Sequence, residues 1–243
     1  MPDPSNAALT VAVTGASGAL GQALLRRWHR RGARLIALCH GCAPLELAGP
    51  DGQPIPLRQV QWQVGQEAAL ESLLEEVDVL VINHGINVHG DAGAAATGRS
   101  LEVNALSAWR LLELFAVVAA RRGETRLDGG RRPEVWVNTS EAEIQPALSP
   151  LYEISKRLLG QLLSLRAPEL AQALRLRRLV LGPFRSALNP IGVMGADWVA
   201  GQILRQADWD WGLIIVTPNP LTYVLMPLAT LTRWAYYGLL RRP

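Results

Sequence analysis

The chain has 243 residues, 24 basic and 21 acidic side chains, a formal net charge of +3 and a hydrophobic fraction of 49%. This composition excludes an intrinsically disordered chain and supplies enough apolar material for one large core. Two cysteines exclude a disulfide-stapled scaffold, and so small a net charge does not indicate a nucleic-acid partner. No secretory signal is visible near the start, so a cytoplasmic location is expected.

Short apolar runs alternate with longer helical stretches along the sequence. Strands are predicted at Leu9–Thr14, Arg34–Cys39, Val60–Val64, Asp78–Asn83, Glu134–Asn138, Arg178–Leu181 and Gly212–Val216. Helices are predicted at Ala19–Arg31, Ala68–Glu76, Ser100–Arg122, Leu151–Leu165 and Ala196–Arg205, with a solvated loop at Arg121–Arg132. The fold class is therefore α/β, with a single Rossmann-like, doubly wound parallel sheet of about seven strands and helices on both faces. One domain is expected to span residues 1–243.

The basic residues are almost all arginines, because 23 of the 24 are Arg and one is lysine, Lys156. Surface positive charge tolerates exchange of lysine for arginine, whereas a site that needs a compact ammonium does not. Lys156 is therefore a candidate functional residue before any motif is considered.

A glycine-rich turn follows the first strand and opens the first helix. It contains Gly15, Ser17, Gly18, Ala19, Leu20 and Gly21. Glycines let such a turn tighten and let the backbone approach a pyrophosphate, while the helix N-terminus offers free N–H groups. The turn therefore predicts a dinucleotide site.

The end of the second strand bears on which dinucleotide is bound. The strand ends in Cys39 and His40 and carries no acid that would bind both ribose hydroxyls and repel a 2′-phosphate. Ser17 and His40 could contact a 2′-phosphate instead. We therefore expect NADP(H) to be favoured over NAD(H).

Tyr152 and Lys156 are four residues apart, so they share one face of a predicted helix. A nearby ammonium favours the phenolate and lowers the pKa of the tyrosine, which suits Tyr152 to general acid/base chemistry. Ser140 lies 12 residues before Tyr152, at the end of the fifth strand, where sites of parallel sheets form. These three residues form the candidate catalytic set.

With these motifs the chain resembles the short-chain dehydrogenase/reductase family over at least residues 9–217. The resemblance implies hydride transfer between a nicotinamide cofactor and a carbonyl or alcohol, in which Tyr152 protonates the carbonyl oxygen and Ser140 hydrogen-bonds it. It also implies that Lys156 binds the nicotinamide ribose and that Asn104 holds a proton-relay water. Further cofactor contacts implied by position are Val64, Asn83, His84, Gly85, Gly182 and Pro183.

Some positions depart from the family pattern. The spacing of Gly15, Gly18 and Gly21 is commoner in the extended branch, which includes epimerases and dehydratases. Only 87 residues follow Lys156, and this length favours the compact branch. Ile82, His84 and Gln63 also replace common residues, and His84 is expected to line the pocket.

Two further features leave the function open. Cys39-His40-Gly41-Cys42 has the spacing of a metal or redox motif, but no second cysteine pair exists, so no metal is expected. The apolar C-terminal segment, residues 218–243, includes Leu221–Leu240 and ends in Arg241 and Arg242. It could pack on the core as a lid or subunit interface, lie on a membrane surface through residues 221–242, or span a membrane.

The predicted substrate loop, residues 184–200, is mostly apolar and carries only Arg185 and Asp197 as charges. We therefore expect an apolar carbonyl or alcohol as the small-molecule substrate, with a lipid-like one included. The main hypothesis is an NAD(P)H-dependent oxidoreductase. An NAD(P)-dependent epimerase or dehydratase and a non-catalytic cofactor-binding regulatory protein are the alternatives. The family resemblance also suggests a homodimer or homotetramer.

Overall fold

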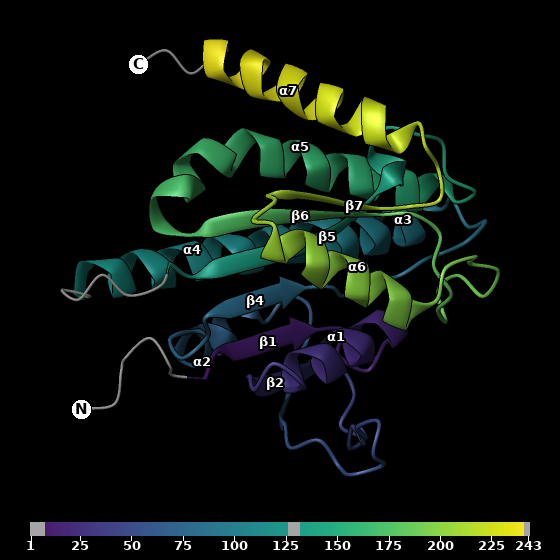
Figure 1. Ribbon diagram of the computed structural model, residues 1–243. Coiled ribbons are helices and arrows are strands. Elements are labelled where there is room, and N and C mark those ends of the chain that lie inside the picture. The colour runs from purple at the N-terminus through teal and green to yellow at the C-terminus, as the bar shows by residue number, and fades with distance from the viewer. Residues whose placement is uncertain (1–7, 126–131, 241–243) are drawn as a thin grey trace.

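The computed structural model describes residues 8–125 and 132–240, so half of the predicted loop Arg121–Arg132 lies outside the described residues, while its first five residues are helical. Seven parallel strands form one sheet in the order β3-β2-β1-β4-β5-β6-β7 (Figure 1). The strands are β1 (Thr10–Thr14), β2 (Arg34–Cys39), β3 (Arg58–Gln61), β4 (Val79–Ile82), β5 (Glu134–Ser140), β6 (Arg175–Leu181) and β7 (Leu213–Val216). Because β1 pairs with both β2 and β4, the strand order reverses at β1, as in a doubly wound sheet.

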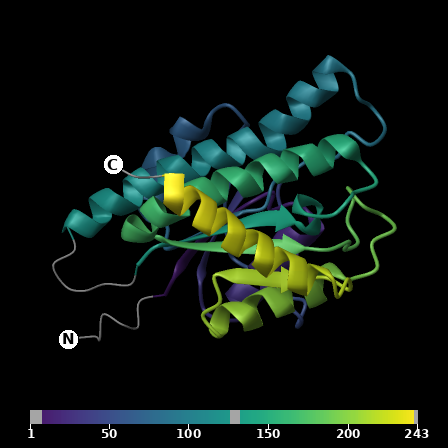
Figure 2. The same cartoon turned by 90° about the horizontal axis from the view of Figure 1, so that it is seen from above.

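Helices cover both faces of this sheet, which confirms the predicted fold class. They are α1 (Ala19–His29), α2 (Glu71–Leu74), α3 (Ala94–Leu101), α4 (Ser107–Thr125), α5 (Pro150–Ala173), α6 (Ala196–Asp208) and α7 (Thr222–Leu240), with the 3₁₀ helices η2 (Glu67–Leu70) and η4 (Glu141–Glu143) and the π-helix η3 (Glu102–Leu106). Helices α1 and α6 pack on one face, and α2, α4 and α5 on the other. Helix α7 lies outside α5, across the top of the molecule (Figures 1 and 2).

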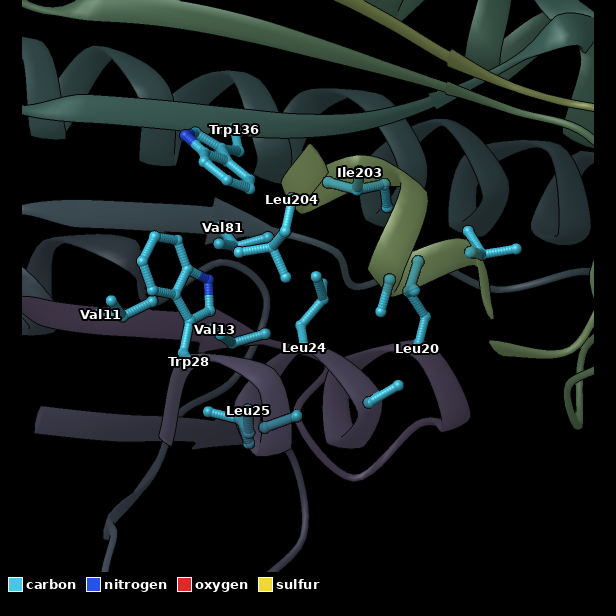
Figure 3. Packing of buried hydrophobic residues seen from close by; sticks show 14 of the residues in the cluster. Val11, Val13, Leu20, Leu24, Leu25, Trp28, Val81, Trp136, Ile203 and Leu204 are labelled. Carbon is cyan, nitrogen blue, oxygen red and sulfur yellow. The ribbon is translucent and has the colours of Figure 1, made fainter. Parts of the chain in front are cut away.

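The core under α1 and α6 is built from alternate residues of the central strands. Val11, Val13 and Val81 point toward Leu24 of α1 and Leu204 of α6 (Figure 3). The indole rings of Trp28 and Trp136 add a tilted contact with centroids 5.5 Å apart. These apolar contacts hold the turn between β1 and α1 against a rigid support.

The second core lies between the sheet and helices α4 and α5. Phe115 and Leu111 of α4 and Leu159 and Leu163 of α5 are fully buried there. Among the described residues, one helical stretch, Ala94–Gly123, is long and apolar enough to cross a membrane, and half of its most apolar 18-residue segment is buried within the protein. Its burial against the sheet accounts for its apolar character.

Several predicted boundaries were wrong. The long helix begins at Ala94 instead of Ser100, and α5 continues through Pro168 to Ala173 instead of ending at Leu165. The helix predicted at Ala68–Glu76 is a 3₁₀ turn followed by the one-turn α2. Strand β3 ends at Gln61, so Val64 lies beyond it. The remaining ends differ by at most three residues, and strand β2 was predicted correctly at both ends.

Candidate active site

The carboxyl ends of β1, β4, β5 and β6 meet at one edge of the sheet, and nearly all the predicted site residues lie there. The turn after β1 is tight: Gly15 has a φ of +62°, and a Cβ on it would lie 3.0 Å from the Cα of His84. A Cβ on Gly21 would overlap the carbonyl oxygen of Gly15. Glycine is thus required at both positions.

The N-terminus of α1 is open to an anion. Gly18 is the N-cap residue, so no side chain caps the helix, and its first turn contains no acidic residue. Ser17, Gly18 and Ala19 are exposed, while Leu20 is buried in the core. The uncapped N–H groups and the positive end of the helix dipole therefore face solvent at the predicted phosphate position.

A compact polar cluster joins β1 to the loop after β4. The hydroxyl oxygen of Thr14 accepts hydrogen bonds from the backbone N–H groups of Asn83 (2.8 Å) and His84 (3.2 Å). This oxygen also lies 2.9 Å from Nδ1 of His84. The imidazole of His84 packs edge-on against the indole of Trp62, with the ring centroids 5.1 Å apart. The Nε2 atom of His84 is buried, and no residue within 8–125 or 132–240 forms a hydrogen bond with it. Burial, followed by the charge of Lys156, lowers the pKa of His84 to about 4, so the imidazole is neutral at pH 7.

Ser140 and Tyr152 come together across the end of β5 and the start of α5. They share a side-chain hydrogen bond, and Ser140 Oγ also accepts from the backbone N–H of Ala142 at 3.2 Å. Burial raises the pKa of Tyr152, and the Ser140 hydrogen bond only partly opposes it. The expected lowering of this pKa was wrong, because burial of the phenol outweighs the hydrogen bond from Ser140. Tyr152 is therefore a neutral phenol.

Lys156 lies one helical turn after Tyr152 and is almost completely buried. Its ammonium donates to the carbonyl oxygen of Asn138 at 3.0 Å and lies 5.6 Å from the centroid of the Tyr152 ring. Burial lowers the pKa of Lys156 to about 8, although the charge of Glu143 works in the opposite direction. The only lysine of the chain is thus brought next to the phenol, as its spacing predicted.

Asn104 lies in the π-helix between α3 and α4, where its side chain clamps the loop after β4. Its Oδ1 accepts from the backbone N–H of Ile86 at 2.8 Å, and its Nδ2 donates to the Ile86 carbonyl at 3.0 Å. Nδ2 also lies 3.1 Å from Ser155 Oγ on α5. Asn104 therefore ties the loop that carries His84 and Gly85 to the helix that carries Tyr152.

The segment after β6 lies at the same edge of the sheet, and its Leu188 lines a pocket there. A Cβ on buried Gly182 would overlap the side chain of Thr217, and the carbonyl of exposed Pro183 accepts from the backbone N–H of Val193 at 3.0 Å. A pocket of about 520 Å³ opens between this loop, α3 and the loop after β4. Its lining is Ile86, Asn87, Val88, Asp91, Ala95, Ala96, Arg99 and Leu188.

At the opposite end of the dinucleotide position, the side chain of His40 is exposed beyond β2 and that of Val64 is partly buried. Cys39 is buried and Cys42 is exposed, and both are free thiols. Within residues 8–125 and 132–240, no group of three or more His, Cys, Asp or Glu side chains gathers as a metal site would require.

Asn138 is a site residue that the motifs did not identify. Besides accepting from Lys156, it donates through Nδ2 to Asn83 Oδ1 at 2.8 Å, so it links β5 to the loop after β4. Strand alternation could have identified it, because residues 138 and 140 point to the same face. Trp62 was missed for a different reason, since only the fold brings it to His84.

Comparisons with known proteins agree with this geometry. A sequence model of the NAD dependent epimerase/dehydratase family matches residues 11–126. The chain is 47% identical over 220 residues to monoglucosyldiacylglycerol epimerase from Synechocystis sp., a match that covers 90% of this chain and 51% of that protein. The chain thus spans about half the length of that curated relative.

Solved structures share the fold at low sequence identity. A short-chain dehydrogenase from Burkholderia cenocepacia in complex with NADP has a TM-score of 0.74 and 19% identity, covering 97% of this chain and 98% of that one. A short-chain dehydrogenase from Sphingobium yanoikuyae in complex with NADPH has a TM-score of 0.72 and 19% identity, with 95% of each chain covered. The predicted resemblance is confirmed: this chain has the fold of the short-chain dehydrogenases/reductases, and its first half matches the related NAD dependent epimerase/dehydratase family.

Proposed function

We propose that this chain is an NAD(P)-dependent epimerase that acts on a secondary hydroxyl of a sugar carried by a lipid. The observation that carries the proposal is the juxtaposition of Ser140, Tyr152 and Lys156 at the carboxyl edge of the sheet. The relative that acts on a glucosyl lipid supports the lipid-linked sugar as substrate. An epimerase is also the alternative that the glycine spacing favours.

The residues present fit a nicotinamide dinucleotide. The uncapped N-terminus of α1 would receive the diphosphate, and Gly15 and Gly21 leave no side chain in its way. Lys156 would bind the nicotinamide ribose, and the buried Nε2 of His84, which no described residue hydrogen-bonds, offers a further polar contact. The bound cofactor would supply a hydride acceptor for the carbon that bears the hydroxyl, and a hydride donor when that carbon is reduced again.

The protein's part of the reaction is the movement of one proton. Because Tyr152 is a neutral phenol, it would first have to lose its proton. As phenolate it would then take the hydroxyl proton while the carbon loses hydride, and Ser140 would hydrogen-bond the resulting keto oxygen. Once the keto sugar has turned its other face, Tyr152 would return the proton to the same oxygen. The configuration of the carbon is inverted, and there is no net oxidation. The ammonium of Lys156, 5.6 Å from the centroid of the Tyr152 ring, would stabilise the phenolate once it forms, although burial dominates and raises the pKa of Tyr152.

The pocket beside the catalytic edge suits a sugar ring. Asn87, Asp91 and Arg99 supply polar groups that can bind hydroxyls, while Ile86 and Leu188 supply apolar surface. We retain NADP(H) as the favoured cofactor, because exposed Ser17 and His40 flank the expected 2′-phosphate position and β2 ends without an acid. Comparing the Kd values of NADPH and NADH tests this preference, and tighter binding of NADH would reject it.

The reaction can be tested with monoglucosyldiacylglycerol in mixed detergent micelles, with either oxidised cofactor added in catalytic amounts. The proposal expects the sugar configuration to change, as followed by NMR of the released head group, without accumulation of reduced cofactor. Tyr152→Phe should lower this turnover by about 10²–10⁴-fold while leaving the Kd for the cofactor unchanged. Stoichiometric reduction of the cofactor instead would support a simple alcohol dehydrogenase.

A second outcome would reject catalysis altogether. If wild-type protein and Tyr152→Phe both bind cofactor and neither converts the glycolipid or a panel of apolar alcohols and ketones, a non-catalytic cofactor-binding role remains. Arg99→Ala is a useful companion variant, because it alters the pocket without touching the catalytic set. It should raise KM for the glycolipid and leave cofactor binding intact.

A further inference from the structure

One side of helix α7 forms hydrogen bonds and an ion pair with the rest of the protein. Thr222 Oγ1 accepts from Gln145 at 2.7 Å, and the Tyr237 hydroxyl donates to Gln161 at 2.9 Å. Arg233 bonds the carboxylate of Glu143 at 2.8 Å, and that carboxylate is completely buried. Arg233 is the only charged residue between Thr222 and Leu240, so the one charge of α7 points into the protein.

The opposite side of α7, called here the outer face, is apolar, and none of the residues that the structure describes covers it. Five of its large side chains are each more than half exposed: Val224, Leu228, Leu231, Tyr236 and Leu239. Trp234 is also more than half exposed, but it lies at the edge of this face, where it lines a pocket together with Thr230 and Ser164. These exposed side chains lie along a helix that crosses the outside of α5 (Figure 2). Monomeric soluble proteins rarely expose so continuous an apolar surface, and such patches usually mark an interaction site.

The charges around the outer face indicate what covers it. The last acidic residue of the chain is Asp210, so residues 211–243 contain no acid and three arginines. Two of these, Arg241 and Arg242, directly follow the helix in sequence. A charge-free helical face with Trp and Tyr among its leucines, followed by basic residues, has the composition of helices that lie in the interface of anionic membranes.

The start of α7 is connected to the catalytic edge. Thr222 Oγ1 lies 3.1 Å from Glu141 Oε2, and the hydroxyl of Thr217 donates to the same oxygen at 2.6 Å. Glu141 immediately follows Ser140 in the chain. The start of α7 is therefore hydrogen-bonded to the residue that follows Ser140.

We propose that the outer face of α7 docks on the surface of an anionic lipid bilayer, with the helix parallel to the membrane plane. The inward pairing of Arg233 with Glu143 keeps charge off this face. The docking surface stands on its own observations. The claim that it presents lipid-borne substrate to Ser140 and Tyr152 rests on the proposed function.

Vesicle co-sedimentation of the full chain tests the docking. Wild-type protein should bind vesicles of phosphatidylglycerol and phosphatidylcholine, and bind vesicles of phosphatidylcholine alone at least several-fold more weakly. The double variant Leu231→Glu/Trp234→Glu should lose at least ten-fold in affinity. Val117→Glu, at a similarly exposed apolar position on α4, is the matched control and should bind as wild type does.

Each other outcome has a defined meaning. Absence of wild-type binding, or equal binding by the double variant, overturns the proposal. A dimer in light scattering that the double variant dissociates, without vesicle binding, assigns the outer face to a second copy of the chain. The double variant should keep its turnover of glycolipid in micelles and lose it on vesicles. Vesicle binding without turnover in micelles would reject the proposed function and leave the docking intact.

Discussion

The two ends of strand β5 differ in how their buried charged groups are paired. At its start, Glu134 accepts from Arg177 at 2.7 Å and from the indole of Trp136 at 2.9 Å, and Arg177 also reaches Asp210 at 3.1 Å. Near its end, the buried ammonium of Lys156 contacts a neutral acceptor, the carbonyl of Asn138. One end of the strand pairs charges with opposite charges, and the other does not.

The pKa shifts express this difference. Burial alone would lower the pKa of Arg177, but Glu134 and Asp210 outweigh it and raise that pKa overall. Burial dominates at Lys156 and lowers its pKa to about 8. Matched charges of this kind serve the structure, whereas a weakly compensated ammonium is held at a cost to stability and is available for chemistry.

The largest expected effect breaks the paired end. Glu134→Ala leaves Arg177 buried without its main partner and should lower the free energy of unfolding by about 3–5 kcal/mol. Urea unfolding followed by tryptophan fluorescence measures this change. Glu46→Ala, at an exposed glutamate, is the control and should stay within about 0.5 kcal/mol of wild type. A loss at Glu134 no larger than the control's would contradict the structural role of the pair.

A smaller effect of opposite sign is expected at the catalytic end. Lys156→Met removes a buried ammonium and should raise the free energy of unfolding at pH 7 by roughly 2 kcal/mol, while abolishing turnover. The wild-type pKa is lowered to about 8, so the unfolded chain binds more protons between about pH 8 and 10.5. Wild-type stability should therefore rise with pH in that window, and the variant should lack this rise. Urea unfolding at pH 7.5 and 9.5 tests both statements, and a destabilised variant would refute them.

The smallest effect concerns His84. Its pKa is lowered to about 4, so only the unfolded chain takes up this proton as pH falls from 6.5. Wild type should lose about 1–2 kcal/mol of stability from this group between pH 7 and pH 5, and His84→Gln should be spared that loss. Thermal unfolding at both pH values provides the measurement, with His29→Gln as control. Equal acid sensitivity of wild type and His84→Gln would show that the imidazole is not buried as described.

The sequence predicted the sheet and the catalytic set well because both rest on local patterns. The β-branched runs, the turn at Gly15–Gly21 and the four-residue spacing of Tyr152 and Lys156 are properties of short segments. The start of α3 was missed because its N-cap is Gly93, which has no side-chain signal. Helix α5 continues past Pro168 because Leu170 is buried on the far side, and that packing outweighs the lost helical hydrogen bond.

What the sequence could not predict depends on contacts between distant segments. The raised pKa of Tyr152 reflects burial, which only the assembled site defines. The ion pairs of Glu143 with Arg178 of β6 and Arg233 of α7 join residues 35 and 90 positions apart. The outer face of α7 could be suspected from its composition, but the inward direction of Arg233 required the fold.

The π-helix at Glu102–Leu106 changes the direction in which the side chains of α4 point relative to those of α3. Here the backbone N–H of Ser107 bonds the carbonyl of Glu102, five residues back instead of four. One extra residue in a turn offsets everything after it by about 100° relative to an uninterrupted α-helix. Two helical segments of different phase can thus both bury their apolar sides, while the amide of Asn104 at their junction points at the Ile86 backbone. Deleting one residue there would restore a regular helix and turn that amide away.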